Sequence, residues 1–397
     1  MVVLFLAILS STPLAAQFQT IPSPTNEELE DVYFLDATTG YIVGDSGVIM
    51  KSETGGLNWT IQYGNDTMRF NRVRFFDQDH GLAVGSDVMR TTDGGATWTE
   101  LNLGNDFYTD LAVLGPETCL ITGYPNSVLR STDKGATFST LVSVTPNQEF
   151  GLLSMVDSLV GYSCYHGGDH TNDVLKTTDG GVNWVLVENT GFVNNSVVEA
   201  FSFVSEGIGF QGGWYNSHLA MTTDSANSWS LAGASNWPEV IDFHIQADLP
   251  YAYYACGWHN MMMKSVDGGQ NWFGLYTGQD TLSKFLGIYF IDAMTGWVVG
   301  DGGMILKTTT GGVVGVEEEV RRDLVKVFPN PARDQVSLEY ASDLKIRAID
   351  LYDTQGRLLR SFAPTYKKLS LEGIPAGMYF LDLHTDKGRN AIELLIE

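Results

Sequence analysis

Short runs of β-branched and aromatic residues, broken by glycine and aspartate, make up most of this chain. Three of them share the spacing Asp-x-x-x-Gly-x-x-x-Gly: VYFLDATTGYIVG from Val32, VRFFDQDHGLAVG from Val73 and IYFIDAMTGWVVG from Ile288. Apolar runs of this length that end at Gly or Asp are typical of strands joined by tight turns. The hydrophobic pattern therefore predicts a protein built of β-strands.

An octapeptide, Ser/Thr-x-Asp-x-Gly-x-x-Trp/Phe, recurs seven times among these runs. The complete copies begin at Thr91, Ser131, Thr177 and Ser265, and the altered copies begin at Ser52, Thr222 and Thr308. Successive aromatic positions lie 39 to 46 residues apart, which is the period of a β-propeller blade. We count three strands before each aromatic residue and a fourth that starts on it. The repeat predicts an all-β fold with seven four-stranded blades.

The residue types of the octapeptide suit a structural role. An Asp side chain can accept hydrogen bonds from the backbone N–H groups that follow it, Gly permits a positive φ, and Trp offers a large apolar area to bury. The seventh copy has lost its aromatic residue, whereas Phe18 to Ile21 form a strand-like run with no repeat of their own. Because a ring of sheets must not leave an open edge, we expect this N-terminal run to complete blade seven.

These octapeptides resemble the Asp-box, or BNR, repeats of sialidase-type propellers. The longer unit, an Asp-x-x-x-Gly run followed by the box, is similar to the photosystem II assembly and stability factor family over residues 17 to 315. The resemblance implies a seven-bladed propeller, in agreement with the count of repeats.

A second domain is expected after a charged linker at residues 316–323. Residues 324–397 contain three ordered landmarks, VFPNPA from Val327, IDLYDTQGRLL from Ile349 and IPAGMYFLDL from Ile374. Their strand-like alternation suits a small immunoglobulin-like β-sandwich. The order resembles the type A C-terminal sorting domain of the type IX secretion system of Gram-negative bacteria. This resemblance implies that the tail engages the type IX machinery and that the protein is secreted or held on the outer cell surface.

The first sixteen residues, MVVLFLAILSSTPLAA, read as a secretory signal peptide. No later stretch is apolar and long enough for a transmembrane helix. The formal charge of −24 lies entirely in residues 1–323, which hold 13 basic and 37 acidic side chains. Such an acidic domain argues against nucleic acid as a partner, because phosphate binding needs Lys and Arg.

Catalytic signatures are weak. The propeller holds five arginines, all in the first three blades, so the arginine clamp of a sialidase is not expected. A glycoside hydrolase with two carboxylates stays open, because carboxylate separation cannot be counted from sequence. The pattern suggests no cofactor. Cys164 and Cys256 fall on blades that are not neighbours, and we expect buried thiols there rather than a disulfide.

Loops that join the second and third strands of blades four to six differ from the GDSG and GDGG of other blades. They place aromatic, His and Asn residues together, a mixture that suits a sugar ring or a peptide. The predicted ligand-binding residues are Tyr165, His166, His170, Trp214, Tyr215, His218, Trp258 and His259. The alternative is that these loops only pack on each other. A metal site at His166, Asp169 and His170 is a further alternative, but we expect no metal there.

Three of the five propeller arginines, Arg69, Arg72 and Arg74, lie within six residues. They could form a basic patch for an acidic partner, as the resemblance to the assembly factors implies, or an internal ion-pair network. The interpretation of the whole chain is a secreted or surface-displayed propeller that acts as a non-catalytic binding module for a glycan or a protein. The alternative is an extracellular polysaccharide-cleaving hydrolase of the Asp-box type.

Overall fold

The computed structural model describes residues 18–104, 107–124, 127–141, 150–165, 174–187, 198–213, 219–232, 240–245, 253–257, 261–275, 277, 283–312, 325–340, 344–353, 358–385 and 388–396. The chain divides into two compact units, Met1–Val314 and Gly315–Glu397. Both are built of strands, and the one helical element in the described ranges is a short 3-10 turn, η1 (Asp301–Gly303).

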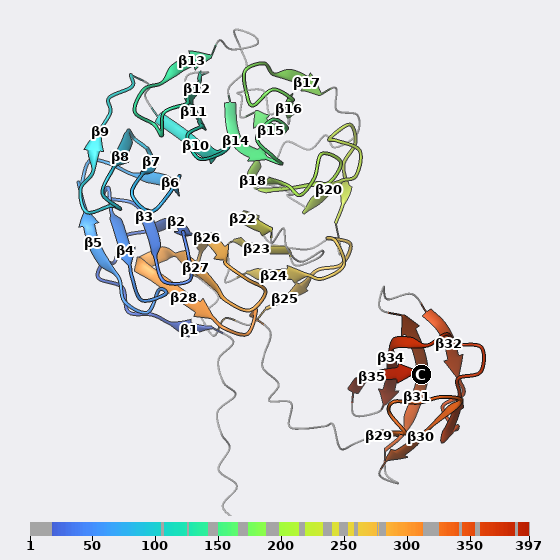
Figure 1. Cartoon of the computed structure of the whole chain (residues 1–397). Helices are drawn as coiled ribbons and strands as arrows, with labels where there is room; N and C mark the ends of the chain where they lie inside the picture. The colour runs from blue at the N-terminus through green and yellow to red at the C-terminus, as the bar shows by residue number, and fades with distance from the viewer. Residues whose placement is uncertain are drawn as a thin grey trace, which may run out of the picture. The chain divides into compact units, whose positions relative to one another are not determined.

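The first unit is a ring of seven four-stranded antiparallel sheets, as the repeats predicted (Figure 1). In each sheet the first strand lies nearest the centre of the ring and the fourth at its outside. The first three sheets in chain order are β2–β5 (Leu29–Phe34, Gly40–Gly44, Ile49–Ser52, Thr60–Tyr63), β6–β9 (Phe70–Phe75, Gly81–Gly85, Val88–Thr91, Thr99–Glu100) and β10–β13 (Phe107–Val113, Cys119–Tyr124, Ser127–Ser131, Ser139–Leu141). The next three are β14–β17 (Phe150–Met155, Gly161–Tyr165, Val174–Thr177, Val185–Val187), β18–β21 (Val198–Phe203, Gly209–Gly213, Ala220–Thr222, Ser230–Leu231) and β22–β25 (Val240–Ile245, Tyr253–Gly257, Met262–Ser265, Phe273–Gly274). The seventh consists of β26 (Phe285–Phe290), β27 (Gly296–Gly300), β28 (Met304–Thr308) and β1 (Gln19–Thr20).

The octapeptide forms a hydrogen-bonded turn between the third and fourth strands. In blade two, the Thr91 hydroxyl oxygen accepts a bond of 2.8 Å from the Gly95 N–H, and Asp93 accepts bonds from the Thr97 N–H at 2.9 Å and the Thr97 hydroxyl at 2.6 Å. Gly94 and Gly95 have φ of +67° and +84°, which glycine adopts without steric cost. The predicted structural role of the octapeptide is confirmed. In blade five Ala226 stands in for the glycine and keeps a φ of +68°.

Stacked aromatic rings join four of the blades to the next blade. The ring of Tyr41 in blade one stacks on Phe75 of blade two with centroids 3.9 Å apart, and Trp297 of blade seven stacks on Phe34 of blade one at 3.5 Å. The box tryptophans pack edge-on against these rings, as Trp59 does on Phe34. The core is therefore a set of inter-blade layers rather than one central cluster. The thiols predicted at Cys164 and Cys256 are buried and free, and so is Cys119, for which no prediction was made.

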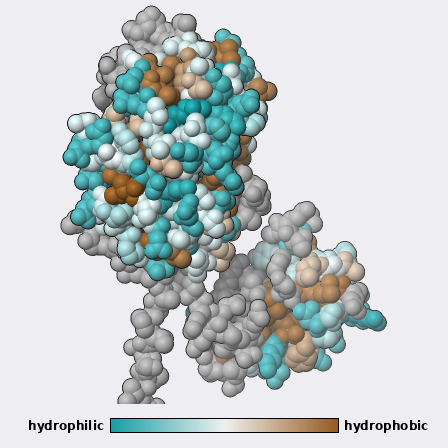
Figure 2. Space-filling view, turned by 60° about the vertical axis from the view of Figure 1, so that its left-hand side comes forward, coloured by the Kyte–Doolittle hydropathy of each residue, from teal (hydrophilic) through white to brown (hydrophobic). Residues whose placement is uncertain are grey.

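The face of the molecule seen in Figure 2 is largely polar, in keeping with the negative charge of the sequence. Figure 2 shows one side of the molecule, where hydrophilic residues cover most of the described surface and apolar residues form small separate groups. The apolar area needed for folding is thus held mainly between the sheets.

The second unit has two sheets, β29 (Val325–Phe328), β30 (Gln335–Tyr340) and β33 (Lys368–Ser370), and β32 (Leu358–Phe362), β31 (Ile346–Asp353), β34 (Gly377–Thr385) and β35 (Gly388–Ile396). Both sheets contribute to one buried cluster that includes Val336, Leu338, Leu351 and Leu381. This is a small sandwich, and its immunoglobulin-like character stays a prediction. The PNPA motif binds the last strand, because the Asn330 side chain accepts from the Leu395 N–H at 2.9 Å.

The ring closes through β1, as the missing aromatic residue of repeat seven predicted. Gln19 pairs with Lys307 and Thr20 with Leu306 on β28, and the Ile21 N–H donates to the Ile305 carbonyl at 2.8 Å. Phe18 and Ile21 on either side of β1 are 1% and 3% exposed. The first and last parts of the propeller thus share one sheet.

Deleting residues 17–24 is expected to lower the melting temperature of the protein by roughly 5 °C or more, because it uncovers the edge of β28 and removes two buried apolar side chains. Differential scanning calorimetry measures the change, with a chain that begins at residue 17 as the control. Equal melting temperatures for the two chains would contradict this account of closure.

Candidate functional site

The residues predicted to bind ligand lie at the edge of what the structure describes. Tyr165 is the last residue of β15, and nothing is described of its side chain. The other predicted residues lie outside the described ranges: His166, His170, Trp214, Tyr215, His218, Trp258 and His259. Asp169 of the alternative metal site lies outside them too. The prediction of a binding site on these residues therefore stays a prediction.

The strands that lead into these loops have a common register. The second strand of blades one, two and seven ends in Gly44, Gly85 and Gly300, and a Cβ at each would stand 2.0 to 2.1 Å from a backbone oxygen of the entry to the innermost strand. The next residue in each of these blades, Asp45, Ser86 or Asp301, donates its N–H to that same oxygen at 2.8 to 3.2 Å. In these three blades, the loop begins with a turn held tightly against the blade.

At this strand position blades three and four carry a tyrosine, Tyr124 or Tyr165, whereas blades five and six keep glycine and differ from blades one and seven at the next residue. Tyr165 pairs with Phe150 in the register that pairs Gly44 with Leu29, so a tyrosine stands at the glycine position of blade four. Blades five and six retain Gly213 and Gly257 there. The residues that follow them in the sequence are Trp214 and Trp258, where blades one and seven have aspartate. The register supports the alignment on which the predicted site depends.

All three clustered arginines pair with carboxylates of the chain, Arg72 and Arg74 inside the ring and the half-exposed Arg69 near the surface, which favours the ion-pair network over a basic patch. The side chain of Arg74 contacts Asp31 at 2.5 Å, and Arg69 contacts Glu30 at 2.6 Å. Arg72 of blade two lies 3.4 Å from Asp110 of blade three and 3.7 Å from Asp242 of blade six. Arg72 thus links blades that are not neighbours along the ring.

The aspartates of this network also connect adjacent blades. Asp31 accepts a bond of 2.9 Å from the Val73 N–H, Asp110 one of 2.8 Å from the Leu153 N–H, and Asp242 one of 3.0 Å from the Ile288 N–H. In each case a carboxylate of one innermost strand binds the backbone of the next. We did not predict this role, although a signal was available: each aspartate begins a strand-like run, as in DVYF, DLAV and DFHI.

All seven innermost strands have an irregular register, a β-bulge, near their start. In four blades, regular pairing resumes at a charged residue of the network: Asp31 in blade one, Arg72 in blade two, Asp110 in blade three and Asp242 in blade six. A bulge re-aims the side chains that follow it. The bulges therefore set which residues line the central channel.

Burial shifts the pKa values of two groups on β22. It raises the pKa of Asp242 to about 6, against the opposing effect of Arg72, and it lowers the pKa of His244 to about 3. His244 is therefore neutral at pH 7, where it packs edge-on against the ring of Tyr289 at 4.9 Å. Asp242 is mostly ionised at that pH.

The carboxylates of the Asp boxes behave differently. Hydrogen bonds from the residue four positions later hold the pKa values of Asp93, Asp133, Asp179 and Asp224 below the ordinary range. A general acid needs a pKa near the working pH, so these four residues are poorly suited to acid catalysis. Their hydrogen bonds stay within their own turns.

The two remaining propeller arginines also serve contacts between blades. Arg90 donates to the Lys134 carbonyl at 3.0 Å, and Arg130 donates to the Gly180 carbonyl at 3.4 Å. Lys264 and Lys307 occupy the same position in blades six and seven and donate to Gly311 and Gly55. All five propeller arginines thus make hydrogen bonds or ion pairs within the propeller.

No group of three or more metal-ligating side chains gathers in the described ranges. None of the helices described there is long and apolar enough to span a membrane.

Comparisons with known proteins agree with this architecture. Residues 11–145 match the family model described as Photosynthesis system II assembly factor YCF48, and residues 326–397 match the Secretion system C-terminal sorting domain. The Photosystem II assembly lipoprotein Ycf48 of Picosynechococcus sp. is 26% identical over 297 residues, covering 62% of this chain and 86% of that protein.

Two solved structures share the fold. The structure of YCF48 bound to D1 peptide has a TM-score of 0.61 at 21% identity and covers 74% of this chain and 97% of its own. PorZ, a surface component of the type IX secretion system of Porphyromonas gingivalis, has a TM-score of 0.57 at 15% identity, over 95% of this chain and 60% of its own. The chain is a seven-bladed Asp-box propeller similar to the photosystem II assembly factors, followed by a C-terminal sorting domain of the type IX secretion system.

Proposed function

We propose that this protein is an exported, non-catalytic binding module whose propeller holds a glycan or a protein ligand. The sorting domain implies secretion or display at the cell surface. The similarity to the Ycf48 proteins concerns the propeller, and export by a type IX tail favours a partner outside the cell over a photosynthetic membrane.

The ligand is expected on the loops between the second and third strands of blades four to six. The observation that carries this proposal is the aromatic residue at the start of each of these loops, at the glycine position in blade four and one residue later in blades five and six. Gly44 and Gly300 close their loops against the backbone, whereas the equivalent position of blade four is Tyr165 and the next residue in blades five and six is Trp214 or Trp258. Aromatic side chains with His and Asn nearby combine apolar area with polar groups, as sugar and peptide sites do.

A polysaccharide hydrolase is the alternative, and one observation favours it. Asp242 has a pKa raised to about 6, which suits a general acid. Asp110 lies on the opposite side of Arg72 and could act as the second carboxylate. We favour binding because both carboxylates already hold the backbone of the next blade. Each polysaccharide that binds is assayed for cleavage, and cleavage of any of them would decide in favour of the hydrolase.

Export depends on the tail in this proposal. In a host with a type IX system, residues 324–397 fused to a periplasmic reporter are expected to carry it out of the cell, and a chain that ends at Asp323 is expected to stay in the periplasm. Immunoblots of culture medium, cell surface and periplasm measure the distribution. Secretion of the shortened chain would contradict the role of the tail.

Binding depends on the aromatic loops. Once glycan and protein arrays have identified a ligand of the full chain, the double substitution Trp214→Ala and Trp258→Ala is expected to weaken its binding by roughly 2 to 4 kcal/mol with little change in melting temperature, as for exposed interface anchors. Calorimetric titration measures the affinity.

The matched control is Asp93→Ala on the other face of the ring. It removes the hydrogen bonds to Thr97 and is expected to lower stability while leaving the affinity of the folded protein unchanged. If the double tryptophan variant is strongly destabilised while its folded molecules bind the ligand as tightly as the wild type, these residues belong to the core and the proposed site is wrong.

A further inference from the structure

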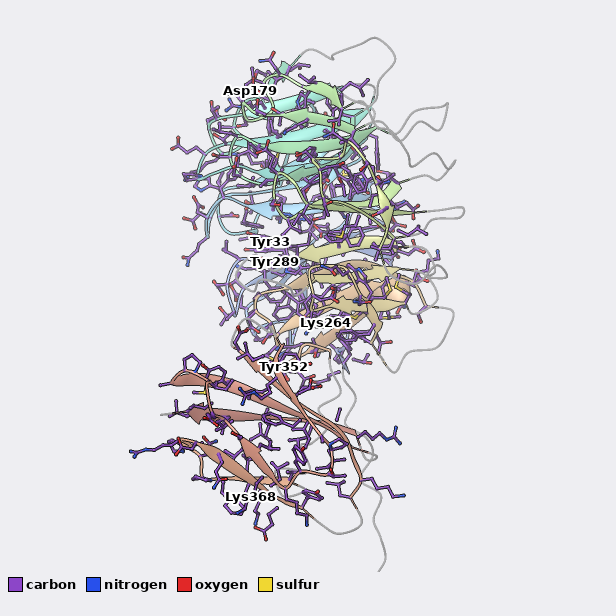
Figure 3. The ribbon with its side chains drawn as sticks, turned by 90° about the vertical axis from the view of Figure 1, so that its right-hand side faces the viewer. Tyr33, Asp179, Lys264, Tyr289, Tyr352 and Lys368 are labelled. Atoms are coloured by element: carbon purple, nitrogen blue, oxygen red, sulfur yellow. The ribbon has the colours of Figure 1, made fainter. Side chains whose placement is uncertain are left out.

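A cavity of about 440 Å³ lies in the propeller channel, next to the ion-pair network. It has a structural cause. The relevant position of each innermost strand is the one that Tyr33 occupies in blade one, two residues after Asp31. Blades three to five carry the small residues Ala112, Ser154 and Ser202 there, whereas the other blades carry Tyr33, Arg74, His244 and Tyr289. Tyr33 and Tyr289 lie next to one another, with ring centroids 5.4 Å apart (Figure 3). The small side chains leave space opposite these large ones.

The five charged groups in and behind the cavity wall do not balance; Arg72, Arg74, Asp110 and Asp242 line the cavity, and Asp31 is buried behind it against Arg74. Asp31, Asp110 and Asp242 are three carboxylates, and Arg72 and Arg74 are the two guanidinium groups that contact them. The network therefore carries one negative charge in excess when all five groups are ionised. His244 does not offset the excess, because it is neutral at pH 7. A cation in the cavity would make this set neutral, whereas an anion would add to the imbalance.

The excess charge is located at Asp242. Its Oδ2 accepts the Ile288 N–H at 3.0 Å, while its Oδ1 lies 3.7 Å from the nearer Arg72 nitrogen, beyond hydrogen-bond distance. By contrast, both oxygens of Asp110 accept backbone N–H groups at 2.8 Å. Asp242 lines the cavity, and in the described part of the chain its Oδ1 is the one oxygen of these two carboxylates without a hydrogen-bond donor.

The rest of the wall is suited to an apolar body. Leu152, Met155, Phe201 and Phe243 line the cavity together with the hydroxyl-bearing Ser202. A ligand that fits has a cationic head, which can donate to Asp242, and a short hydrocarbon chain, which can pack against these residues.

We propose that the channel cavity is a second binding site, which takes an alkylammonium or alkylguanidinium group with its charge on Asp242. A free amine and a lysine or arginine side chain of a peptide present the same group. The site lies in the channel and not on the aromatic loops, so it does not depend on the function proposed for those loops.

Isothermal titration of the full chain with n-butylammonium, n-butylguanidinium and a Gly-Lys-Gly peptide tests the proposal, with butanol and butyrate as the neutral and anionic controls. The two small cations are expected to bind at pH 7.5 and the two controls are not. Binding of the peptide as well would identify side chains of a protein as a source, and its exclusion would restrict the site to free amines. The cations are expected to bind progressively more weakly as the pH falls through about 6, because protonation removes the charge of Asp242.

Two variants test the location of this site. Asp242→Asn keeps an oxygen for the Ile288 N–H but removes the charge, and Ser202→Leu fills the cavity; each is expected to lower the affinity at least about tenfold. Asp79→Asn removes the same charge at an exposed position and serves as the matched control. The proposal is overturned if the wild-type chain binds neither cation, or if both channel variants, folded as judged by circular dichroism, bind as well as Asp79→Asn.

Discussion

A ring of sheets is held together by the contacts between neighbouring blades and by the bond that joins its two ends. Here the ends meet in one sheet, where β1 pairs with β28 and places Phe18 and Ile21 in the adjoining cores. At four joints between blades a ring of one blade stacks on a ring of the next, whereas blades two and three place Leu82 and Leu120 beside the glycine of the next Asp box. Four joints also have a basic side chain that donates to a backbone carbonyl of the next Asp box. Because Phe18 and Ile21 lie in two different clusters, loss of the pairing between β1 and β28 would expose apolar surface of both.

The channel follows from the same requirement. Asp31, Asp110 and Asp242 each hold the backbone of the following blade, and their charges need partners in a confined space. Arg72 and Arg74 supply two of these partners, and the third carboxylate remains only partly compensated. A structural device for joining blades thus leaves a polar cavity at the centre of the ring, separate from the loops that the sequence indicates as the ligand-binding face.

Much of the fold could be predicted because it repeats. The octapeptide appears seven times, with its Asp, Gly and aromatic residues complete in four copies and altered in three, and a local turn such as that of Asp93 needs no long-range information. Closure by Phe18 to Ile21 could be predicted as well, since a missing element at one end of a repeat array implies its supply from the other.

The channel network and the ligand site could not be predicted to the same degree. The contact of Arg72 with Asp242 joins residues 170 positions apart, and it follows from ring geometry rather than from any local pattern. The loops around Trp214 and Trp258 share no repeated sequence, so only their position after a known strand could be inferred. Sequence therefore indicated which loops differ but not which ligand they would fit.

Hydrogen exchange at the seam tests the central claim of ring closure most directly. The Ile21 N–H is bonded to the Ile305 carbonyl, and the outer strand β5 of blade one provides an ordinary outermost strand for comparison. The account predicts that the Ile21 amide exchanges at least as slowly as the amides of β5 that face β4, since both leave the sheet only when a blade opens. Exchange of Ile21 at the rate of an unfolded terminus, with the β5 amides still protected, would contradict closure by the N-terminal strand.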